Sequence, residues 1–296
     1  MINNSHSLRL IRKSLMINSS KEYLANKNLK VGIIDSGIDG NLKALNLSKI
    51  NGRSYIDNSM GLTDELGHGT QILGIINSMI SNFSLNSYKV FNSFYGNSYH
   101  VINAIYDAIR DGNEIINISF GNYQLNSKDN VIVQQFNNAI NYGIETGVIF
   151  TCSNGNEGIN FQYSNYIHLP SSLKGVISAS ASTKDLNIAD YSNYEKYNIS
   201  AIGGELVFNE VNEIEKNKMV LSLRSSMSTY SEDLIYNNEL VYTYGTSISS
   251  AYITALIIKL KTQYPSKSTE FYYNKLLSNS SQIFNKDSLF ENVSFK

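Results

Sequence analysis

The sequence predicts an α/β fold of three layers, in which a mostly parallel central sheet carries helices on both faces. Two observations predict this fold: apolar runs of strand length, and helical apolar patterns that alternate with those runs along the chain. Since the runs are not interrupted by polar residues, we expect the strands to be buried on both faces, as in parallel sheets. Ligands of such sheets bind outside the carboxyl ends of the strands, so functional residues are sought there.

Five apolar runs are predicted as strands, and helical patterns follow several of them. The predicted strands are Val31–Ile34, Tyr88–Phe91, Ile115–Ile118, Val148–Thr151 and Val176–Ala179. Apolar residues at helical spacing follow His68, extend from Val101 to Ile109, and extend from Val133 to Ile140. A further amphipathic helix is expected to begin near Ser247, in GTSISSAYITAL.

The composition excludes several classes of function. The chain has 296 residues, 42% of them hydrophobic, which is enough for a substantial core. Its 24 Lys and Arg residues balance 25 Asp and Glu residues, so no charge footprint for nucleic acid or an anionic membrane is present. The single cysteine, Cys152, suits a reducing compartment, and LRLIRKSLMI lacks the apolar run of a secretory signal. We therefore expect a cytoplasmic protein with no nucleic-acid or membrane partner.

Two polar residues directly follow predicted strands. VGIIDSGID is an apolar strand that ends on Asp35, and TCSNGNEG places Asn156 among glycines just past another strand. Taken alone, Asp35 could be a solvated aspartate in a turn, and Asn156 could be an ordinary turn asparagine.

Two further polar residues stand where predicted helices begin. His68 lies between two glycines in DELGHGTQILGII, and Ser247 precedes the helix in GTSISSAYITAL. Taken alone, His68 could be structural and Ser247 could be a helix N-cap. Serine is a poor nucleophile unless a base activates it, and a histidine base needs a carboxylate to hold its tautomer. The chain supplies all of these groups at one edge of the predicted sheet.

The order Asp, His, Ser, in the motifs DSGID, HGT, GNEG and GTS, resembles the subtilisin family of serine proteases. The resemblance covers about residues 29–264 and implies a subtilisin-like fold. It implies that Asp35 orients His68, that His68 takes the proton of Ser247, and that Ser247 attacks the scissile carbonyl. It also implies that Asn156 and the backbone N–H of Ser247 stabilise the oxyanion.

The same resemblance implies where a peptide would bind. In this family the substrate backbone pairs with the edges of the cleft, as in strand addition. NISFG matches one wall through Ser119, Phe120 and Gly121, and FYGN matches the other through Tyr95, Gly96 and Asn97. The alternative for both is an ordinary strand end or surface turn.

His168 matches the floor of the pocket for the residue before the cut, in IHLPSSLKGVISA. Since no carboxylate stands there to pair with a guanidinium, an uncharged or polar residue such as Gln is expected before the cut. The alternative is a surface histidine.

We expect an N-terminal extension over residues 1–28, a subtilisin-like peptidase domain over 29–280, and a tail over 281–296. No period is visible at about 205–238, which indicates an excursion within that domain. Only 34 residues precede Asp35, fewer than a folded prosegment needs, so the domain is expected to fold unaided or an earlier segment is absent from this sequence.

The sequence departs from the family pattern at several places. Ala251 replaces a proline and Gln71 replaces a histidine, but neither position transfers a proton, so activity is expected to survive. The connection NSMISNFSLNS has no carboxylate for the calcium that secreted relatives hold there, so no metal and no cofactor is predicted. Cys152 is expected to be a small buried hydrophobe and not a nucleophile.

These absences make the chain most similar to the small cytoplasmic peptidases that remove leader peptides from lantibiotic precursors. The expected function is a serine endopeptidase that acts as a monomer on a modified precursor peptide through an acyl-enzyme. A general intracellular subtilisin-like protease and a non-catalytic peptide-binding relative are the alternatives. The intact Asp35, His68, Asn156 and Ser247 argue against the second of these.

Overall fold

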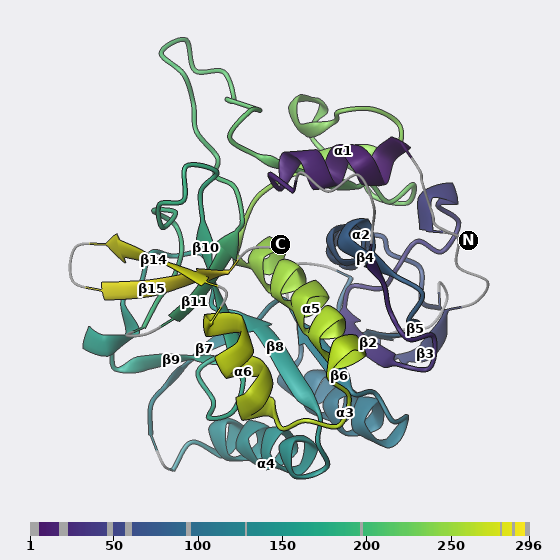
Figure 1. Ribbon diagram of the computed structural model, residues 1–296, viewed down its shortest axis with the longest axis vertical. Helices are drawn as coiled ribbons and strands as arrows, with labels where there is room; N and C mark the ends of the chain where they lie inside the picture. Colours follow the sequence, from purple (N-terminus) through teal and green to yellow (C-terminus); the bar gives the residue numbers. More distant parts are fainter. Residues whose placement is uncertain are drawn as a thin grey trace.

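A nine-stranded sheet forms the centre of the computed structural model (Figure 1). The structure describes residues 6–17, 23–45, 50–56, 61–92, 96–127, 129–195, 198–278, 280–285 and 288–293. The strand order is β14-β15-β11-β10-β8-β6-β2-β5-β3, in which every pairing from β15 to β3 is parallel and β14 is an antiparallel edge strand. The strands are β2 (Lys30–Asp35), β3 (Asn51–Ser54), β5 (Ser84–Lys89), β6 (Ile115–Ile118), β8 (Ile149–Ser153), β10 (Ile177–Ser182), β11 (Asn198–Ile202), β14 (Ser280–Asn285) and β15 (Ser288–Val293).

Four of the five predicted runs coincide with strands of this sheet, shifted by at most a few residues, but the run at Tyr88–Phe91 was placed too late. β5 begins at Ser84 and ends at Lys89. Buried polar residues can lie in this strand because their side chains form hydrogen bonds. Asn86 donates to Asn113 Oδ1 at 2.9 Å, and Lys89 donates to the Thr63 carbonyl at 2.6 Å. Hydrophobicity alone does not mark such a strand.

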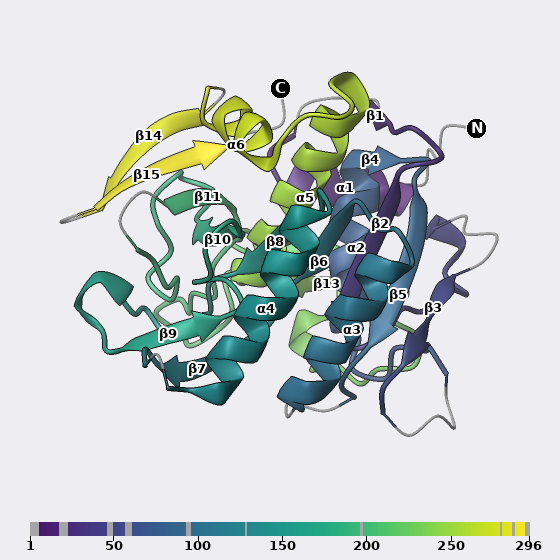
Figure 2. The ribbon, with the colours of Figure 1, turned by 90° about the horizontal axis from the view of Figure 1, so that it is seen from below.

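Helices cover both faces of the sheet, which confirms the predicted three layers. Figure 2 shows α3 (Ser98–Arg110) and α4 (Val131–Glu145) in front of the strands, with α1 (His6–Ser14) and α2 (His68–Met79) behind them. The helix α5 (Thr246–Gln263) also lies behind, and α6 (Thr269–Leu277) lies at the upper edge in Figure 2, in contact with α5 and β15. Asparagine side chains start the two front helices: Asn97 accepts from Tyr99 N–H, and Asn130 accepts from the N–H groups of Ile132 and Val133.

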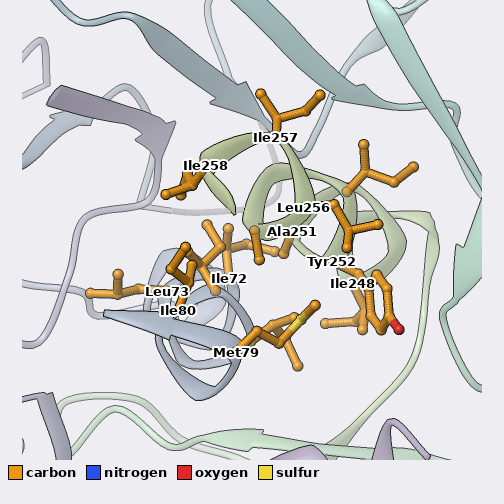
Figure 3. Packing of buried hydrophobic residues seen from close by; sticks show 14 of the residues in the cluster. Ile72, Leu73, Met79, Ile80, Ile248, Ala251, Tyr252, Leu256, Ile257 and Ile258 are labelled. Carbon is orange, nitrogen blue, oxygen red and sulfur yellow. The ribbon is translucent and has the colours of Figure 1, made fainter. Parts of the chain in front are cut away.

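Helix α5 is buried on nearly every side, so the prediction of an amphipathic helix was wrong. Figure 3 shows Ala251 and Ile258 of α5 in one packed cluster with Ile72 and Leu73 of α2. The opposite side of α5 packs on β8, β10 and β11. Because α5 lies between the sheet and α2, apolar or small residues are required around its whole circumference. Burial of each large aliphatic side chain stabilises the fold by about 1.5–3 kcal/mol.

The segment 1–28 contributes to the core through α1. Leu8 and Ile11 are fully buried, Leu15 is nearly so, and α1 packs against α2 and the strand β12 (Val220–Leu223). Ser14 Oγ accepts the backbone N–H of Leu221 at 2.9 Å. A short strand, β1 (Tyr23–Leu24), pairs with β4 (Ile80–Ser81) at the end of α2. The N-terminal segment is therefore continuous with the packing of the helix that begins at His68.

The C-terminal segment is also part of the sheet, since β14 and β15 form a hairpin and β15 pairs with β11. Among the described residues, no helix is both long enough and apolar enough to cross a membrane.

The excursion at 205–238 contains a projecting hairpin followed by β12, which pairs with β13 (Leu240–Thr243). The hairpin, Glu205–Lys218, extends upward in Figure 1. Its neck is closed by the Glu205 N–H, which donates to the Lys218 carbonyl at 3.2 Å. Phe208 pairs with Ile214 across it, and Phe208 and Val211 are exposed.

Candidate active site

The carboxyl ends of three neighbouring strands bring distant parts of the sequence to one place. β8, β6 and β2 are adjacent in the sheet. β2 ends on Asp35, β6 leads into Ser119, and β8 leads into the loop that holds Asn156. Since the strands are parallel, these three groups emerge at the same edge. The first turns of α2 and α5, with His68 and Ser247, face the same cavity.

Asp35 and His68 are joined by a hydrogen bond. The distance between His68 Nδ1 and Asp35 Oδ1 is 2.8 Å, with Asp35 buried and the His68 side chain 29% exposed. A carboxylate oxygen can only accept, so Nδ1 carries the proton and Nε2 of a neutral ring is left as an acceptor. Oδ1 also accepts the backbone N–H of Ser36 at 2.7 Å, which holds the carboxylate in place.

The surroundings of His68 make its ring more basic. Burial lowers the pKa of His68, but the charge of Asp35, its hydrogen bond and the charge of Asp64 outweigh this effect and raise the pKa above its ordinary value. The pair is thus arranged to accept a proton at Nε2.

Asp64 fixes the start of the His68 helix and was not singled out from the sequence. Its Oδ1 accepts from Ser36 Oγ at 2.8 Å and from Gly67 N–H at 2.7 Å. Its Oδ2 accepts from the N–H and hydroxyl of Thr70 at 2.8 and 2.6 Å. Burial raises the pKa of Asp64, and hydrogen bonds from Thr70 and Ser36 counteract that rise. An acidic residue four positions before a helix-starting histidine is the signal that could have identified it.

Ser247 does not cap its helix, which removes the structural alternative for this residue. The N-cap of α5 is Gly245, and Ser247 is the second residue of the helix. Its hydroxyl donates to the carbonyl of Ser119 at 2.6 Å. Because a hydroxyl has one proton, Ser247 does not donate to His68 in this arrangement, and a turn about its side-chain torsion is needed to do so. Within the described part of the chain, its backbone N–H has no acceptor.

The side chain of Asn156 is oriented by the first residue of α5. Its Oδ1 accepts both the N–H and the hydroxyl of Thr246 at 2.9 Å. A backbone N–H must donate, so the oxygen of the amide is the atom turned toward Thr246, and Nδ2 remains available to an anion. Gly245 precedes Thr246 with a φ of 134°, a backbone conformation that favours glycine. Two donors, Asn156 Nδ2 and Ser247 N–H, therefore stand at the positive end of α5.

A cavity of about 720 Å³ connects these groups with both predicted walls of the peptide cleft. Gly96 and Asn97 line one side, and Ser119, Phe120 and Gly121 line the other. Tyr95 lies outside the described residues. The ring of Phe120 packs edge-on against Phe91 at 4.9 Å between centroids. The predicted wall residues that the structure describes thus share one cavity with His68 and Ser247.

His168 is buried beneath this cavity and is not a surface histidine. Only 3% of it is exposed, and Nδ1 lies 2.9 Å from Ser171 Oγ. A Cβ on Gly121 would meet its ring at 2.4 Å, so the ring packs directly under that wall. Burial lowers the pKa of His168 to about 4, partly opposed by the backbone of Ser153. The ring of His168 is therefore neutral at ordinary pH, and Glu157 is the only carboxylate among the described residues that line the cavity.

The second half of the excursion is anchored to the loops that carry Asp35 and His68. Ser225 Oγ donates to the Asp64 carbonyl at 2.7 Å, and the N–H and hydroxyl of Ser226 donate to Asp39 Oδ2 at 2.8 and 2.6 Å. Beyond these anchors, Tyr230 and Leu234 line the cavity beside His68. The excursion thereby supplies one wall of the site.

Cys152 is fully buried, and burial raises the pKa of its thiol, so it is not poised as a nucleophile. Within the described ranges, no group of three His, Cys, Asp or Glu side chains is placed to hold a metal ion.

The chain was compared with known families and proteins. The model of the Subtilase family matches residues 26–292. The chain is 26% identical over 306 residues to the epidermin leader peptide-processing serine protease EpiP of Staphylococcus epidermidis, covering 86% of this chain and 65% of that protein. It is 26% identical over 309 residues to the nisin leader peptide-processing serine protease NisP of Lactococcus lactis subsp. lactis, covering 88% of this chain and 44% of that protein. It therefore spans less than two thirds of the length of either relative.

Solved structures of similar proteins superpose on this chain. The crystal structure of a lanthipeptide protease superposes with a TM-score of 0.83 and 27% identity, covering 97% of this chain and 92% of the other. The crystal structure of the nisin leader peptidase NisP superposes with a TM-score of 0.78 at 22% identity, which supports the fold.

Proposed function

The chain belongs to the subtilase family, and we propose that it is a serine endopeptidase that removes the leader peptide from a lantibiotic precursor. The observation that carries the proposal is the hydrogen bond between Asp35 and His68, because His68 lines one cavity with Ser247 and Asn156. The substrate class rests on the likeness to two leader peptide-processing proteases and a lanthipeptide protease.

The proposed reaction begins when Ser247 turns from the Ser119 carbonyl toward His68. Nε2 of His68 takes the hydroxyl proton as Oγ attacks the scissile carbonyl, and Asp35 stabilises the imidazolium that forms. The negative oxygen is stabilised by Asn156 Nδ2 and the Ser247 N–H. His68 then gives its proton to the leaving amine, and an acyl-enzyme remains on Ser247. A water molecule, deprotonated by His68, hydrolyses this ester and restores the free hydroxyl.

Peptide binding is proposed along the walls formed by Gly96–Asn97 and Ser119–Gly121, and Tyr95 is proposed as a further contact on the first wall. Gly96, Asn97 and Gly121 are exposed, which suits an extended peptide that adds as a strand. The residue before the cut would lie above the neutral ring of His168, which suits an uncharged or polar side chain such as Gln. We also propose that the enzyme acts as a monomer in the cytoplasm, where the buried Cys152 would stay reduced.

Purified protein incubated with a modified lantibiotic precursor tests the proposal by mass spectrometry. Release of the leader by a single cut is expected, whereas unrelated denatured proteins should remain intact. Ser247→Ala should abolish the cut while peptide binding persists, because it removes the nucleophile and little volume. Broad digestion of the unrelated proteins would instead indicate general proteolysis, and turnover by Ser247→Ala would reject the assigned nucleophile.

A further inference from the structure

The loop that carries Asn156 is held from behind by one fully buried side chain, Asn193. Oδ1 of Asn193 accepts the backbone N–H of Glu157 at 3.0 Å and that of Ile159 at 2.8 Å. Glu157 and Ile159 lie one and three positions after Asn156 in the sequence. An amide oxygen has two lone pairs, and both are used here by the same loop.

The amide nitrogen and backbone of Asn193 hold the other half of the loop. Nδ2 donates to the carbonyl of Asn154 at 2.9 Å and lies 2.8 Å from the carboxylate of Glu157. The backbone N–H of Asn193 donates to the Gly155 carbonyl at 3.0 Å. Residues on both sides of Asn156 are thus bonded to Asn193, while Asn156 itself lines the cavity.

Asn193 also connects this loop to a wall of the substrate pocket. Its Nδ2 lies 2.6 Å from the hydroxyl of Tyr123, which lines the cavity and whose ring is 5.1 Å from that of His168. A Cβ on Gly155 would come within 2.5 Å of both Asn193 Nδ2 and the Tyr123 hydroxyl. The loop is therefore in close contact with these two side chains, and Gly155, at φ of 93°, is the residue that permits it.

We propose that Asn193 is a positioning residue that fixes the backbone around Asn156, so that Nδ2 of Asn156 is aimed at the oxyanion. The inference rests on the proposed acyl-transfer function and adds to it a residue that touches neither substrate nor nucleophile. Thr246 fixes the Asn156 side chain, and Asn193 fixes its backbone. Through Tyr123, the same amide couples the oxyanion loop to the pocket for the residue before the cut.

The chemistry of asparagine explains why this residue type is needed. Only a side-chain amide offers two acceptor lone pairs and two donor hydrogens in one rigid plane at this reach. Alanine would leave the N–H groups of Glu157 and Ile159 without their partner, and a loop held by fewer bonds would lose its single geometry. Since displacement of a catalytic group by about 1 Å can cost about 100-fold in rate, a loss of about 10- to 100-fold in kcat is expected for Asn193→Ala.

A double-mutant cycle between Asn193 and Asn156 tests the proposal. Asn193→Ala should lower kcat with little change in KM, and the acid limb of its pH profile should stay where His68 sets it. In the Asn156→Ala background the same change should cost no more than about threefold, because the donor that it positions is already gone. The matched control is Asn160→Ala, which removes a side chain that accepts the Gln162 N–H next to the loop and should leave kcat unchanged.

An equal loss in both backgrounds would overturn the proposal, because Asn193 would then act on the fold and not through Asn156. Thermal unfolding is followed for every variant. If Asn193→Ala does not fold, the cycle is run with Asn193→Ser, which removes the amide but keeps a small, uncharged polar side chain. The substrate is the precursor peptide, or a peptide anilide if the wild-type chain leaves the precursor intact. If the proposed function is wrong, the wild-type chain does not cut the precursor peptide. If only the inference about Asn193 is wrong, the wild-type chain cuts the precursor but the double-mutant cycle shows equal losses in both backgrounds.

Discussion

His68 Nδ1 and Asp35 Oδ1 lie 2.8 Å apart, which joins the start of α2 to the end of β2 across 33 residues of sequence. The buried carboxylate both fixes the tautomer of the ring and favours its charged form. The carboxylate therefore has two opposing effects. It stabilises the imidazolium that forms during the reaction, but it also raises the pH at which the ring becomes neutral and able to accept a proton.

The first prediction concerns pH. The raised pKa of His68 means that the ring stays protonated, and inactive as a base, to a higher pH than an ordinary histidine. The acid limb of kcat/KM should therefore have its midpoint above about pH 6.5. Folding stability has the matching sign: the contribution of the pair is fully present below about pH 6.5 and is lost as the pH rises through the pKa of the folded state. A pH profile of precursor cleavage measures this midpoint.

Asp35→Asn should lower kcat by about 10⁴-fold, because the neutral amide neither stabilises the imidazolium nor enforces the tautomer. Asp129→Asn, at an exposed aspartate outside the cavity, is the control and should leave the rate unchanged. A rate loss below tenfold for Asp35→Asn would contradict the role given to the pair.

The second prediction concerns Asn156. Asn156→Ala removes one of the two donors at the start of α5, so kcat should fall by about 10²–10³-fold with KM little altered. Steady-state kinetics on the precursor peptide measure both constants. Asn187→Ala, at an exposed asparagine outside the cavity, should behave like the wild type. A change mainly in KM would indicate that Asn156 holds the substrate and not the oxyanion.

The third prediction concerns acid stability. His168 is neutral and buried in the fold, with its pKa lowered to about 4, whereas it titrates near 6.5 in the unfolded chain. Its contribution to stability is present above about pH 6.5 and is lost as the pH falls toward 4, which amounts to roughly 3 kcal/mol. His168→Gln cannot titrate and should flatten this part of the stability profile, measured by urea unfolding between pH 4 and 7.

The fourth prediction concerns the N-terminal helix. Ile11 is fully buried between α1 and the rest of the core, so Ile11→Ala should lower the free energy of unfolding by about 2–5 kcal/mol. Arg9→Ala, on the exposed side of the same helix, should change it by less than about 0.5 kcal/mol. Denaturant unfolding compares the two variants. Equal stabilities would mean that α1 is not integral to the domain.

The sequence predicted the fold because its strongest signals, the apolar runs of β2, β6 and β8, reflect strands buried on both faces. It predicted that Asp35 and Asn156 follow strand ends, because a strand end is visible in the sequence where an apolar run stops. It did not predict Asp64 or Asn193, since their importance arises from partners brought near by folding. Ser247 could not be separated from a helix cap for the same reason, because only the structure shows that Gly245 occupies the cap.

The hairpin Glu205–Lys218 has a practical consequence for protein engineering. The two ends of the hairpin meet at a hydrogen-bonded neck, and its tip at Val211 is 73% exposed. Lengthening a loop whose ends are already joined costs little, about 0.6 kcal/mol for each doubling of its length. An affinity epitope or a small reporter domain grafted at this tip would thus make the chain detectable in a cell extract while the anchored segment beyond Ser225 stays in place.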